Sequence, residues 1–76
     1  MAKKIRYLID AAEGGHFIRA YKDRRDFIVQ VWLDKAEPTG EPDGDWGMPA
    51  QIDLTIAVAL AVAQTRDDAA RDAAKK

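Results

Sequence analysis

The chain has 76 residues, of which 47% are hydrophobic and 33% charged, and its formal net charge is −1. This length allows one domain with a single core, and the composition excludes a disordered or membrane-embedded chain. The chain contains no cysteine, which excludes disulfides and thiolate chemistry. No signal peptide is recognisable and no apolar run approaches the ~20 residues that span a bilayer, so we expect a soluble cytoplasmic protein without membrane contact.

The charges are distributed unevenly along the chain. Residues 1–25 carry seven basic and three acidic side chains, whereas residues 26–53 carry seven acidic side chains and one lysine. A chain of this kind can present a basic edge and an acidic edge, each of which attracts a partner of opposite charge.

The first half of the chain predicts three strands, over residues 4–11, 16–22 and 26–34. Residues 4–11 alternate as a strand does, but their apolar residues also fit a helical stripe that ends at Gly14, so a helix is the alternative there. In the second strand we expect Phe17 and Tyr21 on the core face. The third strand has one wholly apolar face that should line the core, made of Phe27, Val29, Val31 and Leu33.

Residues 35–49 predict an irregular loop, because prolines and glycines interrupt them repeatedly. The interruptions are Pro38, Gly40, Pro42, Gly44, Gly47 and Pro49. A loop of this length in so small a domain is typical of a functional or mobile segment.

Residues 50–74 predict one long helix. The segment is rich in alanine and has no internal breaker, Pro49 suits a first helical turn, and Asp67 and Asp68 precede Arg71 at spacings of four and three. A strand remains the alternative over residues 51–64, where large apolar residues alternate strictly with small or polar ones.

As a helix, this segment carries two apolar stripes, one made of Ile52, Ile56 and Leu60 and the other of Leu54, Val58 and Val62. The narrow polar side consists of Asp53, Ala57, Ala61, Gln64 and Asp68. One stripe suffices to cover a sheet, so we expect the other to pair with a second copy in a homodimer or with a partner protein. The candidate self-association residues are Leu54, Val58 and Val62, although the sequence leaves open which stripe is free.

The expected fold is therefore α+β: a three-stranded antiparallel meander with one long C-terminal helix packed on one face, within a single domain spanning residues 1–76. An α-β-β-α order is the alternative, since residues 4–11 also fit a helix.

The sequence gives little support to catalysis or to a bound metal or cofactor. It has no serine or cysteine and a single histidine, His16, next to a glycine pair. Its acidic segment lacks the ligand spacing of a calcium-binding loop. We therefore expect a non-enzymatic protein without a cofactor.

Two binding hypotheses remain. In the first, the acidic segment over residues 34–45 binds a basic surface of another protein and a tryptophan anchors the contact. Its candidate residues are Asp34, Glu37, Glu41, Asp43, Asp45, Trp46 and Trp32. In the alternative, cations around the second strand bind nucleic acid beside aromatic rings. Its candidate residues are Arg19, Lys22, Arg24 and Arg25.

As a short chain with polarised charge, a surplus apolar face and no catalytic constellation, the protein resembles in build the small phage-encoded inhibitors, anti-CRISPR proteins among them. The resemblance is one of size and style and assigns no role to individual residues. It implies an inhibitor whose acidic segment mimics phosphate charge against a basic, nucleic-acid-binding surface of its target.

Overall fold

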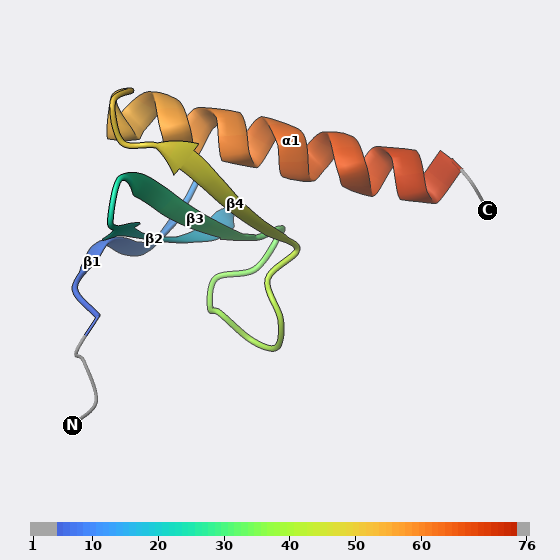
Figure 1. Cartoon of the computed structure of the whole chain (residues 1–76). Helices are drawn as coiled ribbons and strands as arrows, with labels where there is room; N and C mark the ends of the chain where they lie inside the picture. Colours follow the sequence, from blue (N-terminus) through green and yellow to red (C-terminus); the bar gives the residue numbers. More distant parts are fainter. Residues whose placement is uncertain (1–4, 75–76) are drawn as a thin grey trace.

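The computed structural model describes residues 5–74 and shows an α+β fold with one antiparallel sheet and one C-terminal helix (Figure 1). The four strands are β1 (Tyr7–Glu13), β2 (His16–Asp23), β3 (Asp26–Trp32) and β4 (Gly44–Pro49). They lie in the order β1-β2-β3-β4, and helix α1 (Leu54–Ala74) packs on one side of the sheet. Lys4, the expected start of the first strand, lies outside the described residues.

The α-β-β-α alternative is wrong, because residues 7–13 pair with β2 as a strand. The turn between the two strands consists of Gly14 and Gly15, which both have positive φ. Glycine adopts this conformation without steric cost, which suits the tight turn of a hairpin.

The prediction that residues 35–49 form only a loop is wrong at its C-terminal end, because β4 occupies residues 44–49 and makes the sheet four-stranded rather than three-stranded. In β4, Trp46 pairs with Val29 and Met48 with Phe27, so alternate side chains point toward the core. Pro49 is compatible with this strand because it ends an edge strand, where a missing N–H costs no ladder bond.

Helix α1 begins at Leu54, four residues later than expected, because Asp53 caps it. The Asp53 carboxylate accepts a hydrogen bond from the Thr55 N–H (2.8 Å), and its backbone carbonyl accepts one from the Ala57 N–H (2.9 Å). The first bond satisfies an N–H group that has no partner within the helix, and the second is the first backbone bond of the helix itself. Pro49 therefore ends a strand instead of opening the helix.

The side of α1 that faces the sheet is the one predicted to be polar. Ala57 and Ala61 are 0% exposed. Their short side chains let the helix backbone approach the sheet closely, and the larger Leu54, Val58 and Val62 pack half-buried beside them.

Of the other apolar stripe, Ile52 precedes α1 and packs half-buried against the core, whereas the two residues within α1 are exposed. Ile56 is 53% exposed and Leu60 is 44% exposed. The predicted self-association residues Leu54, Val58 and Val62 are therefore less exposed than Ile56 and Leu60.

The sheet face toward α1 carries the core. Val29 and Val31 of β3 and Ile18 and Ala20 of β2 are buried there, which confirms the apolar face predicted for the third strand. The expectation that Phe17 and Tyr21 share this face is wrong. Since alternate residues of a strand point to opposite sides, they lie on the side of the sheet away from α1, called the open face below.

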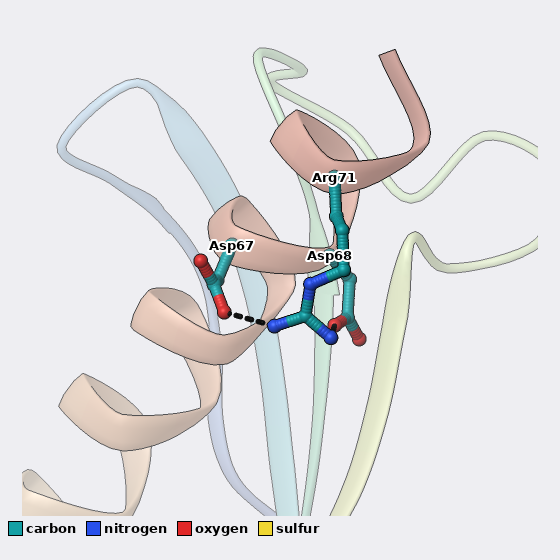
Figure 2. Close-up of polar contacts among 3 residues, drawn as sticks. All are labelled: Asp67, Asp68 and Arg71. Atoms are coloured by element: carbon teal, nitrogen blue, oxygen red, sulfur yellow. Dashed lines mark hydrogen bonds and ion pairs between the residues drawn. The ribbon is translucent and has the colours of Figure 1, made fainter. Parts of the chain in front are cut away.

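The C-terminal part of α1 extends beyond the sheet (Figure 1). There Arg71 forms the ion pairs expected from its spacing, with Asp67 at 2.6 Å and with Asp68 at 3.9 Å (Figure 2). These side chains are largely solvent-exposed, so the pairs support the helix only weakly.

Gly44 is essential to the packing of β4 against α1. A methyl group at this position would overlap the Thr65 hydroxyl and the Trp46 indole nitrogen, whereas one at Gly47 would make an ordinary contact with Ile28. We expect Gly44→Ala to lower the free energy of unfolding by roughly 1–3 kcal/mol, a usual cost of overpacking. Urea denaturation followed by circular dichroism measures this.

Gly47→Ala is the matched control, because it lies in the same strand and has space for a methyl group. Equal destabilisation by the two substitutions would show that the close contact at Gly44 is not what limits packing.

Candidate functional site

Residues 33–43 form a closed loop, called the acidic loop below, on the side of the sheet opposite α1 (Figure 1). Asp43 holds its two ends together: the Asp43 N–H donates to the Val31 carbonyl (2.8 Å), and the Asp43 carboxylate accepts from the Leu33 N–H (2.7 Å). In the middle of the loop, the Trp32 indole N–H donates to the Gly40 carbonyl (3.3 Å). The loop is thus fixed to the sheet by hydrogen bonds although it has no regular structure.

The predicted acidic residues come together only in part. Asp34, Glu37 and Glu41 are exposed on the acidic loop, and Asp45 is exposed on the open face of β4. No lysine or arginine within residues 5–74 forms an ion pair with any of these four carboxylates. Asp43 is also exposed, but its carboxylate closes the loop.

Neither tryptophan is an exposed anchor beside these carboxylates. Trp32 is only 3% exposed, and its ring packs edge-to-face against Phe17, with centroids 5.8 Å apart. Trp46 faces the opposite side of the sheet, where its indole N–H donates to the Thr65 hydroxyl (2.8 Å). Trp32 therefore secures the loop, and Trp46 holds the helix.

The exposed aromatic side chains that we expected from the tryptophans are provided by two tyrosines. Tyr7 and Tyr21 pair across β1 and β2 on the open face, with ring centroids 6.0 Å apart, and Tyr7 is 39% exposed. The alternation of Phe17, Arg19 and Tyr21 in the sequence places all three on one side of β2. Because apolar residues occur on both sides of this strand, the sequence does not indicate which side faces the core.

Tyr21 lies close to the acidic residues of this surface. Burial raises the pKa of the Tyr21 phenol above its usual value, and the negative charges of Asp45 and Asp23 and the nearby Tyr7 raise it further. The phenol therefore keeps its proton over the physiological range, and it can donate a hydrogen bond at the edge of an acidic surface.

The predicted basic residues do not form one patch. Arg19 lies in the middle of the open face, where it is paired with Asp10 at 2.9 Å and its guanidinium lies 4.7 Å from the centre of the Tyr7 ring. Lys22, Arg24 and Arg25 are exposed at the β2–β3 turn, at the end of these strands. The nucleic-acid hypothesis thus keeps three of its four cations in one place, and Arg19 belongs to a different surface.

His16 has a structural position. It is 5% exposed, its Nδ1 accepts a hydrogen bond from the Asp34 N–H (3.2 Å), and its Nε2 contacts the Arg66 guanidinium. The ring connects β2, the start of the acidic loop and α1. Within residues 5–74, no three histidine, aspartate or glutamate side chains are grouped so as to hold a metal ion.

Within residues 5–74, no helix is long and apolar enough to cross a bilayer. No protein-family model matches the chain, and neither does any curated protein or solved structure. Its function is therefore inferred from its own residues.

The raised pKa of Tyr21 predicts a pH dependence of stability. A phenol whose pKa is higher in the folded state than in the unfolded chain stabilises the fold fully below the unfolded value of about 10, and this contribution is lost as the pH rises through the folded pKa. We expect Asp45→Asn to lower the pKa of Tyr21, because it removes one of the negative charges that raise it. The ring-carbon NMR shift of Tyr21, followed against pH, measures the change.

Glu41→Gln serves as the control, since it removes a carboxylate that does not contribute to the raised pKa of Tyr21. If the two variants and the original protein titrate alike, Asp45 does not act on the Tyr21 phenol.

Proposed function

We propose that the protein is a non-enzymatic interaction module that binds a basic surface of another protein. The observation that carries the proposal is the group of four exposed carboxylates on and beside the acidic loop, none of which is neutralised by a cation within residues 5–74. Unpaired surface charges of one sign raise the rate of association with an oppositely charged partner and favour that partner over others.

The acidic loop is suited to this role because it is fixed before a partner arrives. Asp43 closes its ends and Trp32 holds its centre, so binding does not have to order a flexible segment. A preorganised surface loses less conformational entropy on binding and therefore binds more tightly for the same contacts.

Tyr7 and Tyr21 complete the surface. They lie on the open face with Asp45 and offer aromatic area next to the negative charge. Tyrosine is enriched at interface hot spots, because its ring is rigid and its hydroxyl can hydrogen-bond. The partner is thus a protein surface rich in arginine and lysine, of the kind that otherwise binds phosphates; covering such a surface would make the protein an inhibitor of nucleic-acid binding.

Glu37 and Glu41 are the best positions for a test. Both side chains are exposed, and neither carboxylate takes part in the hydrogen bonds that hold the loop, whereas Asp43 does. Reversing their charge therefore changes the surface without opening the loop.

The experiment uses a fluorescein-labelled oligo-arginine peptide as a basic probe and follows its anisotropy. We expect the protein to bind the peptide at low salt, Glu37→Lys with Glu41→Lys to weaken binding by about tenfold or more, and added salt to weaken it further. Arg24→Glu with Arg25→Glu is the charge-reversal control and should leave binding as strong or stronger.

A labelled single-stranded DNA, titrated in the same way, tests the alternative. DNA binding at low salt that is lost in the Arg24→Glu, Arg25→Glu variant, together with no binding of the peptide, would replace this proposal by nucleic-acid binding.

A further inference from the structure

The turn between β2 and β3 carries cations that have no part in the acidic loop. Lys22, Arg24 and Arg25 are exposed there, and Arg6 is exposed immediately before β1. Within residues 5–74, none of these four side chains forms an ion pair. This turn precedes β3 and the acidic loop follows it, so the seven residues of the strand keep the two roughly 20 Å apart (Figure 1).

Folding alone does not account for the arginine at position 24. Arg24 is the first of the two turn residues between the paired Asp23 and Asp26, and its φ is 59°. Glycine is the usual residue where such a turn requires a positive φ, because a larger residue is strained there. The Arg25 carbonyl accepts a hydrogen bond from the Ala50 N–H (2.8 Å), which fixes the turn to the segment after β4. The charged turn is therefore held in place before any ligand binds, which lowers the entropy cost of binding.

A shallow hollow of about 690 Å³ lies on the β1 side of this turn. Three cations and one carboxylate line it: Arg6, Lys22, Arg24 and Asp23. Ile5 and Leu8 line it as well, and these apolar side chains are 52% and 48% exposed. A nucleotide combines a negative phosphate with a flat base, so it matches both the charged and the apolar part of this lining.

A second hollow, of about 480 Å³, lies on the β4 side of the same turn. Its charged residues are again three cations and one carboxylate: Lys22, Arg24, Arg25 and Asp26. Because Lys22 and Arg24 line both hollows, the two are adjacent and form one positively charged tract across this end of the sheet. A tract with several cations in succession suits a chain of phosphates better than a single small anion.

We propose that this tract binds a short segment of single-stranded nucleic acid. Lys22 and Arg24 contact phosphates at the middle of the segment, where the two hollows meet. A base packs against Ile5 and Leu8 in the hollow on the β1 side. A duplex fits less well, because its bases are stacked on one another and offer no free face to these side chains.

The charge of the acidic loop supports this placement. Its carboxylates repel a polyanion, so a nucleic acid is directed to the other end of β3. An acidic protein segment would also neutralise the cations, but carboxylates alone do not cover Ile5 and Leu8. The tract and the acidic loop lie at opposite ends of one strand, so this site does not depend on the basic partner proposed for the loop.

The anisotropy of a short, fluorescein-labelled oligothymidylate tests the site. We expect binding at low salt, and we expect Lys22→Gln to raise the dissociation constant roughly fivefold and to lower the salt dependence by about one phosphate contact. Lys35→Gln is the matched control, because it removes the same charge from an exposed lysine of the acidic loop. No binding at low salt, or an equal loss in the two variants, would overturn the proposal.

A second pair of variants tests the contact with a base. Leu8→Ser should weaken binding of the single strand about threefold without changing its salt dependence, since it removes apolar area and no charge. Ile56→Ser removes a similarly exposed apolar side chain on α1 and should leave binding unchanged. Equal affinities of these two variants would contradict the base contact.

Competition experiments identify the class of ligand. Unlabelled oligothymidylate should displace the labelled strand at lower concentration than a duplex of equal length or an oligo-glutamate peptide of equal charge. Equal displacement by either competitor would overturn the proposal, and equal displacement by the peptide would assign the tract to acidic protein segments. Lys22→Gln should still bind the oligo-arginine peptide normally, so this proposal and the one for the acidic loop can fail separately.

Discussion

The position of α1 depends on one contact among Trp46, Thr65 and Gly44. The indole N–H of Trp46 donates to the Thr65 hydroxyl, which itself donates to the Ala61 carbonyl at 2.7 Å, so a polar group buried at the helix–sheet boundary is fully paired. Gly44 provides the space for this pair. With the helix held this close to the sheet, the small side chains of Ala57 and Ala61 are completely buried beneath it, and the large side chains lie on the flanks and on the outer side.

The two sides of the sheet carry different surfaces. On the α1 side, the helix leaves Ile56 and Leu60 exposed to solvent. On the open face, the hydrogen bonds of Asp43 and Trp32 fix a loop whose remaining carboxylates point to solvent. The sheet separates the acidic loop from helix α1 (Figure 1).

The candidate site was only partly predictable, because charge density along a sequence says nothing about pairing in space. The acidic residues are close in sequence and lie on one loop and the adjoining strand, so they also lie on the same part of the folded molecule. Arg19 is close in sequence to the basic turn, but Asp10 and the Tyr7 ring hold it on the open face. The sequence suggested Trp32 and Trp46 as anchors of an interface with a partner. In the fold, both indole N–H groups instead donate hydrogen bonds to other residues of the chain.

The sequence by itself determined the α+β class, the first hairpin with its glycine turn, the apolar face of β3 and the ion pairs of Arg71, since all of these follow from short-range spacing. Only the tertiary structure decided that residues 44–49 join the sheet, that Tyr21 faces outward and that α1 turns its alanines inward. Residues 44–49 were predicted as a loop because glycine and proline interrupt them, which an edge strand tolerates. For Tyr21 and α1 the physical reason is the same. Strand and helix periodicity shows which residues share a side, but when both sides are apolar it does not show which side is covered; that depends on how closely two elements can approach.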